Sequence, residues 1–394
     1  MIYAHKTRLH VNNVQANFLQ RCCGMRRVAY NWALAEWKRQ YDVGEKPYIA
    51  DIDKRFNRWK QGHWEEKPWL YAVPSCCGQQ AIKYDLKNAM RHFFRRVKQG
   101  GEKPGFPRFK KRGIRDSVEF TVVCIRPKHI QGTRLLLPKK MGLARLGDPL
   151  RYAGKLMSTT VSRSGNKWYA AFAIEVDEAL DYPAANDTPI GVDVGVAKFA
   201  ALSDGTEFEP IHAFKKMSAR LARAQRKLSR MEKFSNNWKK QQKNIRAIHA
   251  SIKHMRNDYA NQVSAKLTEQ YGQIYIEDLA IRNMSQSAKG TADAPGKNVK
   301  AKTGLNRAIL DQGWYRFRVM LEYKSARHGG QVIAINPQYT SQRCSVCDYI
   351  DAANRKTQAA FVCQECGHAE NADINAARNI LQIGLELSVQ TQKT

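Results

Sequence analysis

Two pairs of cysteines near the end of the chain constrain its fold more than any other feature. Cys344 and Cys347 form one C-x2-C pair, Cys363 and Cys366 form a second, and 15 residues separate the pairs. Two residues between sulfurs allow one tight turn to aim both thiolates at a single ion. The spacing therefore predicts a zinc ribbon with structural Zn²⁺, since four thiolates leave no open position for water or substrate. His368 would be a spare fifth ligand, so a surface position is expected for it.

An acidic residue follows the ribbon at the start of a predicted helix. The stretch NADINAARNI (371–380) places Ile374, Ala377 and Ile380 at helical spacing, so Asp373 falls in the first turn. The helix dipole alone favours an acid there, and this ordinary explanation often suffices. Asp373 becomes a candidate functional residue because two other carboxylates lie in apolar strands elsewhere.

Those two carboxylates are Asp193 in IGVDVGV (190–196) and Glu277 in GQIYIED (272–278). A buried acid without a partner is costly, so each strand favours a functional site. Three carboxylates in one cleft would raise one another's pKa, and divalent cations would remove that conflict. Hard oxygen ligands favour Mg²⁺ or Mn²⁺. Two such ions about 4 Å apart would activate a water and stabilise the leaving oxygen in phosphodiester cleavage.

The elements around these acids follow a recognisable order. The strand of Asp193 precedes a hairpin, basic helices, the strand of Glu277, a helix at 305–327, a strand at 331–335, the ribbon and the helix of Asp373. A loop is expected at 284–303. This order matches an RNase H-like fold, in which a central strand, its neighbour and a following helix would bring the three acids together.

The first half of the chain divides into helical and strand-like parts. Helical patterns at 14–41, 51–64 and 78–98 precede a basic Gly/Pro-rich linker at 100–113. Short strands with a period of two follow between 117 and 177, including a hairpin at 157–176. We expect a small β-barrel that the N-terminal strand at 2–11 joins. A second linker, DYPAANDTP, is expected at 181–189.

The net charge of the chain is +31, from 66 Lys and Arg against 35 Asp and Glu in 394 residues. A globular protein with that charge repels itself unless a polyanion compensates it, so nucleic acid is the expected partner. A membrane surface is the alternative, but no amphipathic anchor, lipidation motif or signal peptide supports it. Adjacent cysteines such as Cys22-Cys23 suit buried small residues in a reducing cytosol. We expect a cytoplasmic protein that joins the nucleoid when it binds DNA.

Basic residues are interleaved with aromatic rings along the N-terminal helices, and they dominate a long helical segment at 214–256 that breaks near 234–237. Like charges at helical spacing destabilise a helix, and nearby phosphates would relieve that repulsion. The alternative is that the rings form the core and the charges keep the chain soluble. The candidate nucleic-acid contacts are Arg26, Arg27, Lys54, Arg58, Arg220, Arg223, Arg226 and Lys227.

Several motifs together resemble the TnpB family, which insertion-sequence transposons encode and which is similar to the ancestors of type V CRISPR effectors. They are GVDVGVAKFAALSDG, IYIEDL, the two cysteine pairs, NADINAARNI, PSCCGQQAIKYDLKNAMRHFFRR and GFPRFKKR. The resemblance covers nearly the whole chain and is most specific in its C-terminal part. One departure is Asp348, where the family has glycine after the second ribbon cysteine.

The resemblance implies a multidomain α/β and α+β chain with Asp193, Glu277 and Asp373 as nuclease carboxylates. It implies an RNA transcribed from the transposon end that guides cleavage of double-stranded DNA beside a short flanking motif. The implied domains are a wedge-like barrel (1–11 and 106–186), a helical recognition lobe (12–105), a RuvC nuclease (187–340 and 370–386), the zinc ribbon (341–369) and a tail (387–394).

Two other functions remain open at this point. A nuclease-inactive relative would use a guide RNA to occupy DNA and repress transcription, but such a protein should lack one of the three acids. A DNA transposase with an RNase H-like core would keep the acids, although the ribbon and the lobe do not favour it. The oligomeric state, the guide and the flanking motif are not set by the sequence.

Overall fold

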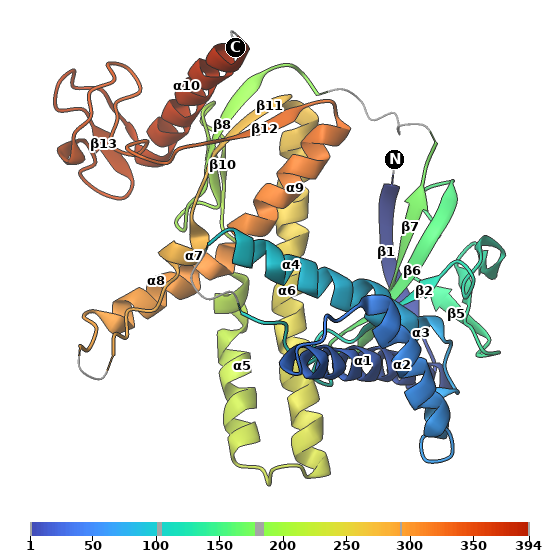
Figure 1. The fold of residues 1–394 in the computed structure, drawn as a ribbon. Coiled ribbons are helices and arrows are strands. Elements are labelled where there is room, and N and C mark those ends of the chain that lie inside the picture. Colours follow the sequence, from blue (N-terminus) through green and yellow to red (C-terminus); the bar gives the residue numbers. More distant parts are fainter. Residues whose placement is uncertain (1, 101–104, 178–184, 292–293, 393–394) are drawn as a thin grey trace. The chain divides into compact units, whose positions relative to one another are not determined.

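The computed structural model describes residues 2–100, 105–177, 185–291 and 294–392. The chain forms two compact units, Met1–Ala179 and Leu180–Thr394. Each unit combines helices with a β-sheet (Figure 1), so the mixed helix and sheet composition predicted from the sequence is confirmed. Parts of both predicted linkers, residues 101–104 and 181–184, lie outside the described residues.

The first unit contains the three predicted helical segments. They are α1 (Asn13–Asp42), α2 (Ile49–Gly62) and the run α3 (Cys76–Gln80), η2 (Ala81–Leu86) and α4 (Lys87–Lys98), with η1 (Pro68–Leu70) before that run. η2 is a π-helical turn. Helix α1 begins with a reciprocal cap between Asn12 and Gln15, which satisfies its first free N–H groups. Val97, in the last turn of α4, is exposed although Leu86 and Met90, earlier in the same run of helices, are buried.

A seven-stranded sheet completes this unit, with the order β2-β6-β7-β1-β5-β4-β3. The strands are β1 (Ile2–His10), β2 (Ser117–Thr121), β3 (Ile130–Gln131), β4 (Arg134–Leu136), β5 (Leu143–Leu146), β6 (Lys155–Ser164) and β7 (Lys167–Glu175). The N-terminal strand β1 pairs antiparallel with β7, as predicted. The alternation of apolar residues that begins at Val118 continues in the sequence to Cys124, but β2 ends at Thr121 because a turn follows. Among the described residues β2 and β3 are edges, so the pairing does not close a barrel.

The second unit is built on a five-stranded sheet with the order β10-β9-β8-β11-β12. Its strands are β8 (Pro189–Asp193), β9 (Ala200–Leu202), β10 (Glu207–Phe208), β11 (Gln273–Glu277) and β12 (Gln331–Ile335). Strand β11 lies parallel to both β8 and β12, whereas β8, β9 and β10 are antiparallel. The sheet therefore has a central β8 with a hairpin on one side and two parallel strands on the other.

Helices cover both faces of this sheet (Figure 1). The helices of this unit are α5 (Ala213–Ser229), α6 (Asn236–Gln270), α7 (Ile281–Met284), α8 (Val299–Gln312), α9 (Trp314–Arg327) and α10 (Ala372–Gln392), of which α6 and α9 lie on one face of the sheet and α10 on the other. Ile190 and Ile274 point to the face that α6 and α9 cover, and Tyr275 packs with Ile380 of α10 on the other. Period-two alternation along a strand thus sorts the side chains between two helical layers.

Four helix boundaries differ from the prediction. The basic segment breaks between Ser229 and Asn236 as expected, but α6 continues to Gln270. The expected loop at 284–303 is shorter, since α8 begins at Val299, and the expected single helix at 305–327 is interrupted at Gly313, whose φ is +74°. The expected tail after residue 386 is helical as far as Gln392. None of the helices that the structure describes combines the length and apolarity needed to cross a membrane.

Candidate active site

Asp193 and Glu277 lie side by side at the carboxyl ends of two neighbouring parallel strands. Ile276 of β11 is paired with Val192 of β8, so the next residue of each strand is one of the two acids. Because side chains alternate, Asp193 shares a face with Gly191, and Glu277 shares it with Tyr275. That face is the one covered by α10.

Two glycines bring α10 onto the sheet. A Cβ on Gly191 would lie 2.0 Å from the carbonyl oxygen of Ala377, and a Cβ on Gly384 would lie 2.0 Å from the ring of Tyr275. Because Gly191 has no side chain, the backbone of β8 packs directly against the backbone of α10. Because Gly384 has none, the ring of Tyr275 packs directly against the backbone of α10. The first turn of α10, which carries Asp373, is thereby held at the strand ends that carry Asp193 and Glu277.

The ionisation of Asp193 depends on the other two carboxylates. Burial, and then the negative charges of Glu277 and Asp373, together raise the pKa of Asp193 to about 8. Burial also raises the pKa of Glu277 and of Asp373, while the positive charge of Arg355 lowers both. The structure brings together the three acids that the sequence singled out, and their catalytic role stays a prediction at this point.

The surroundings of the acids fit divalent cations. Their oxygens are hard ligands of the kind that Mg²⁺ and Mn²⁺ prefer. Burial is the main reason that the pKa values of all three acids are raised, and a bound cation would favour their charged forms. Among the described residues only the four cysteines bring their ligand atoms within 4.8 Å of one another, so the three acids lie further apart than the sulfurs do. Arg355, from the loop after η4 (Ala352–Asn354), is the cation that reaches the site, with Nη2 3.3 Å from Oδ1 of Asp373. Sequence reasoning missed Arg355, because nothing in the residues around it marks it as close to Asp373.

The raised pKa of Asp193 predicts how pH changes the stability of the metal-free chain. The pKa of its carboxyl group is ordinarily 3.8 and is about 8 in the folded chain. Between these values the folded chain keeps a proton that the unfolded chain has lost, so the free energy of unfolding falls as pH rises. Asp193→Asn removes this effect and should raise the melting temperature more at pH 8 than at pH 5. Thermal denaturation without added Mg²⁺ measures this, with the exposed Asp278→Asn as control; equal gains at both pH values would contradict it.

The four cysteines of the predicted ribbon converge on one point. Their sulfur atoms all lie within 4.8 Å of one another, with 3.7 Å between Cys344 and Cys366 and 3.5 Å between Cys347 and Cys363. A tetrahedral Zn²⁺ with bonds of about 2.3 Å requires sulfur separations close to these. The set therefore fits a structural zinc ion.

Two details of the ribbon refine the sequence prediction. Asp348, at the position where glycine was expected, adopts a left-handed backbone with φ of +63°, which explains the preference for glycine there. Its carboxylate forms an ion pair with Arg343 at 2.9 Å, a contact that a glycine at this position could not make. His368 is not a fully exposed surface residue: its ring is half-buried and lies 3.6 Å from Glu370.

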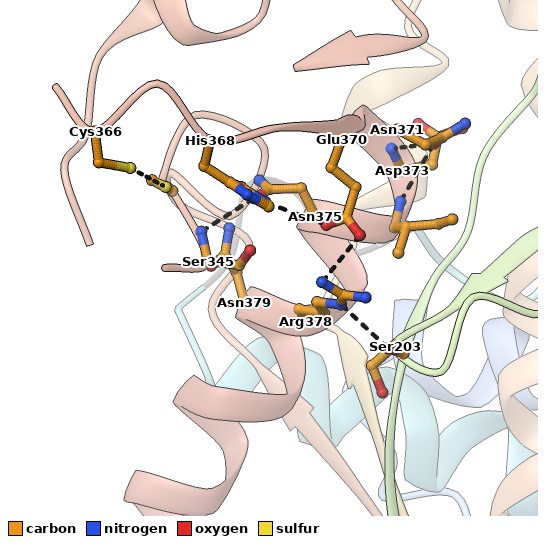
Figure 2. Close-up of polar contacts among 12 residues, drawn as sticks. Ser203, Ser345, Cys366, His368, Glu370, Asn371, Asp373, Asn375, Arg378 and Asn379 are labelled. Atoms are coloured by element: carbon orange, nitrogen blue, oxygen red, sulfur yellow. Dashed lines mark hydrogen bonds and ion pairs between the residues drawn. The ribbon is translucent and has the colours of Figure 1, made fainter. Parts of the chain in front are cut away.

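Buried asparagines of α10 tie the ribbon to the strand ends (Figure 2). Asn375 accepts a hydrogen bond from the backbone N–H of Ser345 and donates one to the carbonyl of Arg343. Asn379, one turn later, donates to the carbonyls of Thr340 and Arg343 at 2.9 and 2.6 Å. Both side chains are fully buried. The sequence NADINAARNI places Asn375 and Asn379 four residues apart, on one face of the predicted helix. Asparagine is unfavourable inside a helix, so this pair was a sign of buried hydrogen bonds that the sequence analysis missed.

Thr340 extends this network to the acids. Its hydroxyl lies 2.5 Å from Oε1 of Glu277 and donates to it, which stabilises the charged carboxylate. On the other side of the helix, Arg378 forms an ion pair with Glu370 at 2.9 Å and also contacts the carbonyl of Ser203 (Figure 2). The ribbon, α10 and the sheet are thus joined by polar contacts beside the candidate site.

Loss of one asparagine should test this connection. Asn379→Ala would leave the carbonyls of Thr340 and Arg343 without that donor, and an unsatisfied buried polar group costs about 1–3 kcal/mol. We expect a lower melting temperature and a shifted Thr340, hence weaker support of Glu277 and slower DNA cleavage. Thermal denaturation and single-turnover cleavage measure the two effects. Glu386→Ala, on the exposed side of the same helix, is the control; if both variants behave alike, the network has no such role.

The predicted nucleic-acid contacts have different environments. Arg220, Arg223, Arg226 and Lys227 are exposed along α5, where the last three line a cavity of about 480 Å³ with Arg230. Lys54 and Arg58, both on α2, line a second cavity, which has a volume of about 510 Å³. In contrast, Arg26 forms a bidentate pair with Asp85, and Arg27 lies 3.6 Å from Asp116. Their ion pairs make these two weaker candidates.

Comparison with protein families gives three matches along the chain. A profile described as "Cas12f1-like, TNB domain" matches residues 314–380, one described as "Probable transposase" matches 171–288, and one described as "Helix-turn-helix domain" matches 1–46. In the structure, residues 2–46 hold one strand and one long helix, so the third description does not match the local geometry.

Named relatives span almost the whole chain. "Putative RNA-guided DNA endonuclease InsQ" of Escherichia coli strain K12 is 42% identical over 97% of this chain and 92% of its own length. "Putative RNA-guided DNA endonuclease" of Streptomyces pristinaespiralis is 30% identical over 98% and 90%. Among solved structures, CasPhi-2 (Cas12j) bound to crRNA covers 98% of both chains with 12% identity and a TM-score of 0.44.

Proposed function

Since the chain belongs to the TnpB family, we propose that it is an RNA-guided DNA endonuclease that cleaves phosphodiester bonds at the cluster of Asp193, Glu277 and Asp373. The observation that carries the proposal is that cluster: three acids distant in the sequence meet where two parallel strands end and one helix begins. A repressor that only occupies DNA would have no need of three mutually repelling buried carboxylates. The RNA-guided endonuclease activity is inferred from the relatives, and the location of the catalytic site is inferred from the geometry.

The three acids are proposed to hold two Mg²⁺ or Mn²⁺ ions. When bound, these ions would supply an activated water and stabilise the charge on the leaving oxygen. Thr340 orients Glu277 through its hydroxyl. Arg355 compensates part of the negative charge of Asp373 in the absence of metal, and is placed to approach a phosphate once metals hold the carboxylates.

The strand order supports an RNase H-like, RuvC-type nuclease as the domain that holds this site. The strand of Asp193 is central, the strand of Glu277 is its neighbour and the helix of Asp373 follows, in the element order expected from the sequence. We keep the proposed boundaries of 187–340 and 370–386, and extend the domain through Gln392 because α10 continues. The ribbon at 341–369 is proposed to hold structural Zn²⁺. The wedge-like sheet (1–11 and 106–186) and the helical lobe (12–105) remain proposed recognition domains.

Guide RNA is proposed to bind the basic surface of α5. The neighbouring positive side chains repel one another unless phosphates lie close by. Replacing Arg220, Arg223, Arg226 and Lys227 by Glu should weaken RNA binding and reduce the slope of log K against log salt, because fewer counterions are released. Filter binding between about 50 and 200 mM salt measures both. Gln225→Glu, exposed on the same helix, is the control, and an unchanged slope would locate the RNA elsewhere.

The decisive test is cleavage with a defined guide. RNA that co-purifies with the chain is sequenced, and the purified complex is then given Mg²⁺ and plasmids that either match or mismatch that RNA. Cleavage of the matched plasmid alone supports the proposed function. Binding of that plasmid without cleavage would support the repressor, and excision with rejoining of transposon ends would support a transposase.

A further inference from the structure

We propose that an aromatic pocket between α1 and α4 binds one unpaired base of the guide RNA, an inference that rests on the proposed function. The pocket has a volume of about 380 Å³. Trp37 and Tyr41 of α1 line one wall, Phe93 and Phe94 of α4 line the other, and Phe106 from the segment after α4 completes it. This volume lies within the range of pockets that hold small ligands, about 300–1,000 Å³.

A role in the core explains only part of this pocket. Phe93 and Phe106 are half-buried and pack against the core of the first unit, and their rings meet edge to face at 5.2 Å. In contrast, Tyr41 is 71% exposed and Phe94 is 45% exposed. Two rings thus present apolar faces to solvent beside a cavity, which costs free energy unless another flat group covers them.

The charges around the pocket indicate what that group is. Lys38, also in the lining, places its ammonium 5.0 Å from the ring centre of Phe106 and 5.9 Å from that of Phe109. Exposed Arg95 and Arg96 lie on the same helix as Phe94. Cations beside aromatic rings fit a nucleotide chain, whose phosphates stay outside while its base stacks.

Asp42 indicates which part of the nucleotide enters. Asp42 is one of the lining residues, so a phosphate inside the pocket would meet a like charge. A base edge instead offers N–H donors that a carboxylate accepts. Unpaired RNA bases that stack on aromatic side chains and bond through their edges are the usual targets of sequence-specific RNA binding.

The test compares two exposed rings with a matched ring elsewhere. Tyr41→Leu and Phe94→Leu keep an apolar side chain but remove the flat face. Tyr315→Leu is the control, since Tyr315 is 73% exposed on α9. The probes are fluorescein-labelled oligouridylate and oligodeoxyuridylate of equal length, with one 4-thiouridine in the RNA for photo-crosslinking. Circular dichroism melting verifies that each variant is folded.

We expect each pocket variant to weaken binding of the RNA probe on the order of tenfold, with an unchanged salt slope because no phosphate contact is lost. Crosslinks should fall on peptides containing Tyr41 or Phe94. If both variants bind the RNA probe with wild-type affinity, or if only binding of the DNA probe is weakened, the pocket does not bind an RNA base. Either result leaves the proposed function unaffected. Absence of RNA binding by the wild-type chain would overturn both.

Discussion

Asp193→Ala, Glu277→Ala and Asp373→Ala are each expected to abolish cleavage of a matched plasmid while leaving RNA and DNA binding largely intact. The three acids are not among the basic residues proposed to contact the phosphates of the guide RNA, and their proposed ligands are metal ions. Loss of one ligand misplaces a metal, and the lost positioning and charge stabilisation cost on the order of a thousandfold in rate. Single-turnover cleavage and filter binding, performed on the same preparations, separate the two effects.

A matched control lies one residue away from the site. Asp278 follows Glu277 directly but forms an ion pair with Arg318 at the surface, so Asp278→Ala should cleave like the wild type. EDTA should reproduce the alanine variants, and Mg²⁺ should restore cleavage where Ca²⁺ does not, since Ca²⁺ accepts looser coordination and aligns the water poorly. Wild-type cleavage by any one of the three alanine variants would remove that residue from the proposed site.

The second large effect is expected at the ribbon. The wild-type chain should hold one zinc ion, and Cys344→Ser or Cys363→Ser should release it, because three thiolates no longer complete the tetrahedral site. Metal analysis by mass spectrometry and thermal denaturation measure the loss of zinc and of stability. Cleavage should also fall, since β14 (Ala369–Asn371) of the ribbon runs directly into the first turn of α10, which carries Asp373.

The control for this experiment is Cys124→Ser, which alters a free thiol outside the ribbon. It should leave the zinc content unchanged. A cysteine variant of the ribbon that lacks zinc yet melts and cleaves like the wild type would show that the ion neither folds the ribbon nor positions Asp373.

The features predicted correctly from the sequence are those that depend on short stretches of chain. The cysteine spacing alone determined that two turns present four sulfurs, and the sulfurs converge within 4.8 Å. Apolar runs that end in an acid indicated strands β8 and β11, and helical spacing placed Asp373 in a first turn. In each case the periodicity of neighbouring residues carries the information, because hydrogen bonding within one turn or along one strand is local.

Where the prediction was wrong, longer-range contacts or single backbone positions decided the structure. A left-handed Gly313 divides the predicted helix at 305–327, and a turn after Thr121 ends a strand whose alternation continued to Cys124. The nucleic-acid contact expected for Arg26 stays a prediction, and the structure adds that Asp85 engages its guanidinium with two hydrogen bonds. A basic residue in the sequence does not disclose whether the fold supplies its counter-charge.

Local patterns in the chain were enough to identify which residues the site could contain, whereas long-range packing establishes how they meet. Asp193, Glu277 and Asp373 were identifiable one by one, but their proximity depends on the close approach of α10 to the sheet at Gly191. Arg355 joins the acids only because a loop of the ribbon folds back over them. Such contacts connect residues far apart in the chain, so no local pattern encodes them; they follow from the packing of the whole domain.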